Sequence, residues 1–156
     1  MQKKQVHYFT NIAPHYRERL WKHLANDEEL KFEFYFGRSR SGSIKEINFH
    51  EEFWLKKNER LHGLENIYFS GRIVWQRGVL SEIVSKGVRQ AIFLGDMNIL
   101  STWVASLILK IKGAEVYFWG HGFMGNESWL KKKFRILFNR LADGHFLYGD
   151  RARRLM

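Results

Sequence analysis

Short runs of apolar and aromatic residues recur along this chain, and most are followed by a segment whose apolar residues are spaced as on one face of a helix. The runs are rich in aromatic and β-branched residues and contain no glycine or proline, which favours strands. They predict strands at 6–10, 32–36, 67–69, 91–94, 115–119 and 145–148. The helical spacing predicts a helix that begins at Pro14 and further helices over 79–84, 100–111 and 130–141.

Two segments depart from this regular pattern. The segment 100–111 is apolar on almost every side, so its helix is expected to be buried. From 38 to 65 the pattern is poor, with a basic loop, a short strand at 44–49 and an irregular or partly helical stretch at 52–60. We therefore expect the variable part of the domain between 38 and 65.

Strands that alternate with helices imply right-handed βαβ crossovers, and these build a parallel sheet covered by helices on both faces. The predicted fold class is α/β, a Rossmann-like three-layer domain with a mostly parallel sheet flanked by helices. Residues 1–156 are the length of one such domain. The loops that follow the strands should line one edge of the sheet, where ligands bind in this kind of fold.

One of these loops, G-H-G-F-M-G at 120–125, carries a histidine between two glycines. Glycines allow a tight turn and a close approach of the backbone to a ligand, and they leave the ring of His121 without bulky neighbours. We predict that His121 is exposed and catalytic, carrying a proton or donating to a phosphate or a sugar hydroxyl. The alternative is a loop histidine bonded to a backbone carbonyl. Gly120, Gly122 and Phe123 are candidate substrate contacts beside it.

Two other loops offer polar side chains to the same edge. Asn11, Tyr16 and Arg17 surround the start of the first helix, where Arg17 could clamp a carboxylate or a phosphate. Asp96 and Asn98 follow the strand at 91–94. All five are candidate substrate-binding residues. The alternatives are a capped helix with a solvated face for the first group, and a plain turn with a helix cap for the second.

The chain carries 26 Lys and Arg against 16 Asp and Glu, a net charge of +10. Such an excess favours an anionic partner, which could be a nucleic acid, an acidic bilayer surface or a phosphorylated substrate. The absence of cysteine excludes disulfides and thiolate metal sites. The seven histidines are scattered without metal-ligand spacing, so no metal is expected.

The first residues are polar and basic, and no apolar stretch is long enough to span a bilayer. A cytoplasmic location is therefore expected. The runs Lys131-Lys132-Lys133 and 151–154 are typical of solvated faces, and they would also allow peripheral contact with the anionic inner face of the membrane.

Three segments resemble the amino-terminal, acceptor-side domain of family 4 glycosyltransferases, which have the two-domain B-type fold. They are Y-F-T-N-I-A-P-H-Y-R at 8–17, V-Y-F-W-G-H-G at 116–122, and L-A-D-G at 141–144 with F-L-Y-G at 146–149. The resemblance covers nearly the whole chain and is weakest from 38 to 65.

The resemblance implies the acceptor-side half of a retaining, metal-independent enzyme without a cofactor. That enzyme would transfer a sugar from a nucleotide-sugar donor to a glycan or lipid-linked acceptor. His121 would contact the sugar or stabilise charge in the cleft, and Asn11, Tyr16, Arg17 and Asp96 would lie on the acceptor side. The second, donor-binding domain is expected to lie outside these 156 residues, so the chain alone is expected to be inactive.

Two other functions are open at this point. The charge is compatible with a basic module that binds nucleic acid or an anionic surface without catalysis, although nucleic acid is not the partner we expect. The sequence at 120–125 also matches the dinucleotide-binding pattern G-x-G-x-x-G, but it follows a late strand and not the first one.

Overall fold

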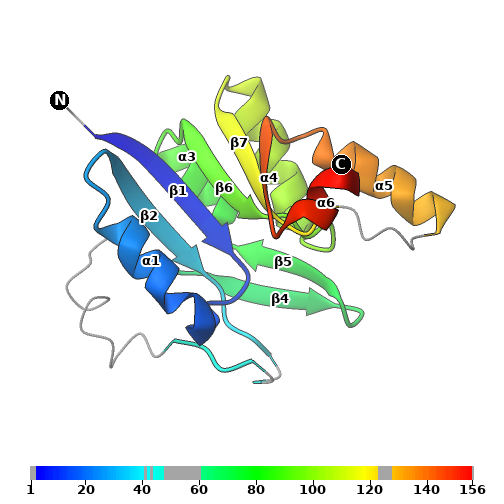
Figure 1. The fold of residues 1–156 in the computed structure, drawn as a ribbon, viewed down its shortest axis with the longest axis horizontal. Helices are drawn as coiled ribbons and strands as arrows, with labels where there is room; N and C mark the ends of the chain where they lie inside the picture. The colour runs from blue at the N-terminus through cyan, green and yellow to red at the C-terminus, as the bar shows by residue number, and fades with distance from the viewer. Residues whose placement is uncertain (1–2, 41, 43, 48–60, 123–127, 156) are drawn as a thin grey trace.

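The computed structural model describes residues 3–40, 42, 44–47, 61–122 and 128–155. Its central sheet has six strands in the order β3-β2-β1-β6-β7-β8, and every neighbouring pair is parallel. Figure 1 shows the twisted sheet with helices on both sides, which confirms the predicted Rossmann-like three-layer fold. The strands are β1 (Lys4–Thr10), β2 (Leu30–Phe36), β3 (Leu61–Gly63), β6 (Gln90–Leu94), β7 (Glu115–Gly120) and β8 (Gly144–Leu147).

The helices divide between the two faces of the sheet. One hydrophobic cluster joins α1 to one face, and another joins α3, α4 and α5 to the opposite face. The helical elements are the 3-10 turn η1 (His15–Arg17), α1 (Glu18–Ala25), α3 (Val79–Ser85), α4 (Leu100–Ile111), α5 (Trp129–Asn139) and α6 (Asp150–Leu155).

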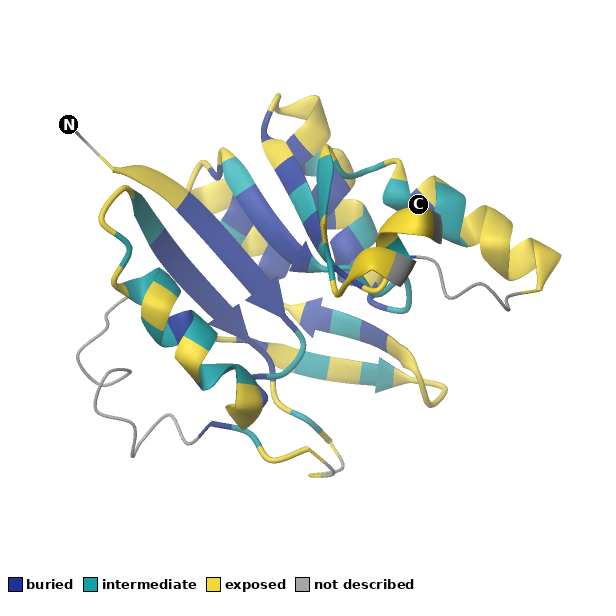
Figure 2. Ribbon diagram, viewed as in Figure 1, coloured by how far each residue is buried: buried dark blue, intermediate teal, exposed yellow. Residues whose placement is uncertain are grey.

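The aromatic content of the strands fills both layers of the core. Because side chains alternate along a strand, Tyr8 of β1 packs toward α1 while Phe9 packs toward α3 and α4. The ring of Phe9 stacks on Tyr35 at 4.3 Å and on Phe93 at 4.8 Å between ring centroids. On the α1 side, the fully buried Trp21 lies 4.7 Å from Phe36. Figure 2 shows β1 and β2 buried along most of their length.

The amino-terminal half holds two strands that the sequence pattern did not predict. β4 (Glu65–Phe69) contains the predicted strand at 67–69, but it pairs antiparallel with β5 (Ile73–Arg77) in a separate hairpin. The two strands that the pattern did not predict are therefore β5 and β3. The strand expected at 44–49 is reduced in its described part to one bridge between Pro14 and Glu46, and 48–60 lies outside the described residues.

Two expectations about helices were wrong. Pro14 is extended and forms the bridge to Glu46, so the first regular helix starts at Glu18, after a 3-10 turn. The helix α4 is buried on one side only, because Leu107 is 53% and Ile111 is 79% exposed. The hydrophobic surface of α4 therefore exceeds what the sheet covers.

The β4–β5 hairpin lies beside the carboxyl ends of β1 and β2 (Figure 1), and two amide side chains hold it there. The buried Gln76 donates through Nε2 to the Thr10 carbonyl and to Asn66 Oδ1, both at 3.1 Å. Asn66 Nδ2 donates to the carbonyls of Asn11 at 2.5 Å and Arg38 at 2.8 Å. The chain at Gly37 must pass close to these groups, since a Cβ there would lie 2.4 Å from the Asn11 carbonyl oxygen.

We expect Gln76→Ala to lower the free energy of unfolding by about 1–3 kcal/mol, because it removes a buried donor from its acceptors. Urea denaturation measures the change. The matched control is Arg77→Ala in the same strand, whose ion pair with Glu65 is exposed and should be worth less than about 1 kcal/mol. Equal losses in the two variants would contradict the anchoring role of Gln76.

Candidate functional site

The carboxyl ends of the strands border a cleft of about 350 Å³. It lies where the strand order reverses, since the chain runs from β1 outward to β2 on one side and later to β6 on the other. In open parallel sheets this reversal separates the loops and creates a binding crevice. The lining residues come from η1, the β4–β5 turn, α5 and the loops after β6, β7 and β8; they are Arg17, Arg72, Leu94, Gly95, Asp96, Asn98, Gly120, His121, Gly122, Lys131, Arg135 and Tyr148.

His121 stands directly after β7 and is exposed at the rim of this cleft. Its ring centroid lies 4.5 Å from that of Tyr148. Gly122 has φ +62°, a conformation that glycine adopts at little cost. Among the described residues, no carbonyl accepts a hydrogen bond from the imidazole. The ring is thus presented to the cleft by the glycine loop and supported by one aromatic neighbour.

Close backbone packing forms the floor below His121. Gly95 N–H donates to the Trp119 carbonyl at 2.8 Å, which ties the loop after β6 to the end of β7. A Cβ on Gly120 would lie 3.3 Å from the Gly95 carbonyl oxygen, tighter than an ordinary contact. Glycine at both positions therefore lets the two loops meet.

The cleft is positively charged. Arg17, Arg72, Lys131 and Arg135 line it, and Asp96 is the one carboxylate among the described lining residues. Cationic side chains in a concave site attract and orient anions, and guanidinium groups match the geometry of phosphate. An anionic ligand is therefore the chemistry that this cleft favours.

Two of the guanidinium groups are held in place by hydrogen bonds. Arg17 donates to the hydroxyl of Tyr148, with its Cζ atom 5.2 Å from the centre of that ring. Arg135 donates to the Gly122 carbonyl at 3.2 Å, which links α5 to the histidine loop. Burial raises the pKa of Tyr148 and raises that of Tyr8, beside Arg17, to about 12. Both phenols therefore stay neutral and do not neutralise the positive charge of Arg17.

Six of the predicted site residues line the cleft: Arg17, Asp96, Asn98, Gly120, His121 and Gly122. Tyr16 is 63% exposed beside Arg17 and is outside the lining. Asn11 is outside it too, and its carbonyl accepts from Asn66. Phe123 lies outside the described residues. Asp96 also forms the plain turn that was the alternative to a substrate contact. Its Oδ1 accepts hydrogen bonds from the backbone and side-chain nitrogens of Asn98 at 2.9 and 2.8 Å.

Three cationic residues of the cleft, Arg72, Lys131 and Arg135, were not predicted as site residues from the sequence. Arg72 belongs to the turn of a hairpin that the pattern did not predict, so no signal pointed to it. Arg135 follows Lys131 by four residues on a helix that begins after the histidine loop, and this spacing places both on one face. That periodicity could have identified Arg135, and it also shows that Lys131 contributes to the cleft as well as to a solvated charge run.

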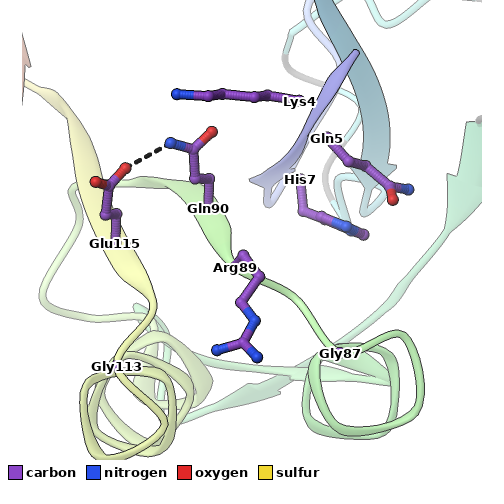
Figure 3. Close-up of a pocket in the computed structure, with 8 residues that line it drawn as sticks. All are labelled: Lys4, Gln5, His7, Gly87, Arg89, Gln90, Gly113 and Glu115. Carbon is purple, nitrogen blue, oxygen red and sulfur yellow. Dashed lines mark hydrogen bonds between the residues drawn. The ribbon is translucent and has the colours of Figure 1, made fainter. Parts of the chain in front are cut away.

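A second hollow, of about 460 Å³, lies at the opposite edge of the sheet (Figure 3). Lys4 and Arg89 face it together with Glu115, which accepts a hydrogen bond from Gln90 at 2.5 Å. Gly87 and Gly113, which follow α3 and α4, complete the lining with Gln5 and His7. This hollow lies at the amino ends of the strands and next to the carboxyl ends of two helices, where the helix dipole disfavours anions. The edge that carries His121 is therefore the better candidate site.

No protein-family model matches this chain, and no curated protein sequence matches it significantly. Within the described residues, no group of three or more histidine or acidic side chains is arranged to hold a metal ion. No helix in this part of the chain is both long enough and apolar enough to cross a bilayer.

We expect the stability of the protein to fall as the pH is lowered from about 6.5 toward 4. Burial lowers the pKa of His7 from 6.5 to about 4, so in this interval the unfolded chain binds a proton that the folded chain does not. Glu33, His62, Glu82 and Lys86 are the charged or titratable groups around His7, and the pKa of His145 is lowered by burial as well.

The variant His7→Phe keeps an aromatic ring against Tyr35 and should flatten this pH dependence, with the slope from His145 remaining. Thermal unfolding at pH 7, 6, 5 and 4.5 measures it. His23→Phe, at an exposed position on α1, serves as the control and should keep the slope of the unmodified protein. An identical slope in His7→Phe would contradict the assignment to His7.

Proposed function

We propose that this chain is the acceptor-side domain of a retaining, metal-independent glycosyltransferase that uses a nucleotide-sugar donor. One observation carries the proposal: an exposed imidazole, His121, stands between two glycines at the carboxyl edge of a Rossmann-like sheet, inside a cleft lined by four cationic side chains. The segments that resemble family 4 glycosyltransferases, around 8–17, 116–122 and 141–149, contribute five residues to this cleft: Arg17, Gly120, His121, Gly122 and Tyr148.

The cationic lining of the cleft supports sugar transfer as the reaction. In the reaction the bond between the anomeric carbon and the donor phosphate oxygen breaks, a hydroxyl of the acceptor bonds to that carbon, and the proton of this hydroxyl passes to the nucleoside diphosphate that leaves. Negative charge grows on the leaving phosphate, and preorganised cationic donors stabilise it most when they surround it in a partly dry site. In this chain Arg17, Arg72, Lys131 and Arg135 would supply that charge.

His121 would act on the sugar side of the reaction. An imidazole at the rim can donate a hydrogen bond to a sugar hydroxyl or share a proton with the reacting oxygen. The neutral hydroxyl of Tyr148 and the amide of Asn98 are further partners for sugar hydroxyls along the same wall. In this proposal a second Rossmann-like domain holds the nucleotide and closes over this edge, and the present chain provides the acceptor half.

The dinucleotide-binding alternative has less support. Its glycine pattern belongs after the first strand, where the pyrophosphate meets the next helix. Here the residues after β1 are Asn11-Ile12-Ala13-Pro14, without glycine, and Pro14 is engaged with Glu46. The matching pattern follows β7, the fifth strand of the sheet.

We expect His121→Ala to lower sugar transfer at least about 10²-fold in the enzyme that this chain forms with a donor-binding domain. Because His121 is exposed, the free energy of unfolding should stay unchanged. The assay follows transfer of a labelled sugar from a panel of nucleotide sugars. His23→Ala, an exposed histidine of α1 outside the cleft, is the matched control and should retain full turnover.

Equal turnover in the two histidine variants would remove His121 from the mechanism. If no nucleotide sugar supports transfer by the unmodified enzyme, the glycosyltransferase assignment itself is wrong.

A further inference from the structure

An almost wholly apolar groove of about 360 Å³ runs directly beside the cationic cleft. Its lining comes from β5, α4, α5 and the loop after β6, and consists of Ile73, Met97, Asn98, Leu100, Trp103, Lys131, Phe134 and Leu137. Asn98 and Lys131 line both cavities. The two hollows are thus neighbouring parts of one surface that changes from charged to apolar at these two residues.

The helices that form the walls of the groove are held together by buried aromatic contacts, although the apolar side chains that line it face water. Phe138 of α5 is fully buried and packs against Trp103 at 4.9 Å and Phe118 at 4.4 Å, which holds α5 against α4 and β7. In contrast, Phe134 is 59% and Leu137 is 55% exposed. Figure 2 shows α5 mostly exposed beyond this anchor. Contiguous exposed apolar side chains of this kind mark a binding surface more often than chance.

We infer that the ligand of this surface is a single amphiphile, a phosphate-bearing lipid whose hydrocarbon chain lies in the apolar groove and whose phosphate lies in the cleft. This inference rests on the proposed function and specifies its acceptor as lipid-linked. The phosphate would meet Arg72 and Lys131, and the chain would run along Leu100, Phe134 and Leu137.

The arrangement of charge decides among the occupants that an apolar groove can take. A purely apolar segment of a protein partner would offer no negative charge to Arg72 and Lys131, whereas an anionic head followed by a hydrocarbon chain matches both cavities at once. Lys131 stands at the boundary, where its methylene stem can contact the chain while its ammonium reaches the phosphate.

Binding of decyl phosphate below its micelle concentration, followed by calorimetry, tests the inference. We expect it to bind at least about tenfold more tightly than inorganic phosphate or decanol, because a few buried methylene groups add that much affinity. Phe134→Gln should weaken decyl phosphate about tenfold and leave inorganic phosphate unchanged. Arg72→Gln should weaken both. Val84→Gln, an exposed apolar position of α3 outside both cavities, is the control and should bind like the unmodified chain.

Equal affinities for decyl phosphate in Phe134→Gln and Val84→Gln would overturn the inference. So would binding to vesicles of phosphatidylglycerol without binding of monomeric decyl phosphate, since that would mean docking on a bilayer. Self-association that Phe134→Gln abolishes, with no lipid bound, would assign the groove to a second copy of the chain.

Sugar transfer to a water-soluble glycan, measured in parallel with the full enzyme, separates this inference from the proposed function. Transfer without any decyl phosphate binding overturns the lipid-linked acceptor and leaves the glycosyltransferase. Binding of decyl phosphate with the predicted variant effects, in the absence of transfer from every donor, leaves the amphiphile site and removes the reaction.

Discussion

The parallel pairing of β1 with a neighbour on each side is the constraint on which the rest of the structure depends. β1 pairs with β2 over seven residues and with β6 over three. Because all three strands point the same way, their carboxyl ends meet at one edge, and the connections that leave them must diverge. The aromatic layers above and below β1 fix this register, and the functional loops follow from it.

The hairpin β4–β5 turns this shared edge into an asymmetric site. Asn66 and Gln76 use their amides to hold the hairpin over the ends of β1 and β2, so that part of the edge is closed by protein. The part of this edge that stays open lies at the ends of β6, β7 and β8. The turn of the same hairpin brings Arg72 to the open part, and Ile73 borders the apolar groove beside it. One partly buried polar network therefore determines both the shape of the cleft and part of its charge.

The sequence reveals the sheet more readily than the site. Five strands of the central sheet are aromatic or aliphatic runs, and the glycines around His121 indicate an exposed ring. The sequence pattern does not predict the hairpin, because its second strand buries Val74 and Gln76 on one face. A polar residue thus interrupts the apolar alternation that would indicate a strand. β3 has only three residues, too few for any periodicity. The amphipathic pattern of α5 does predict a helix, but it cannot tell that Phe138 packs inward while Phe134 is left open.

The contact between Arg17 and Tyr148 joins positions 131 residues apart along the chain. One partner follows β1 near the middle of the sheet, and the other follows β8, an edge strand of four residues. Edge elements with few partners open locally at much lower free energy than the centre of a domain. Fraying of β8 would release the tyrosine and widen the entrance while the interior stays folded, so access to the cleft depends on a short strand at the margin of the sheet.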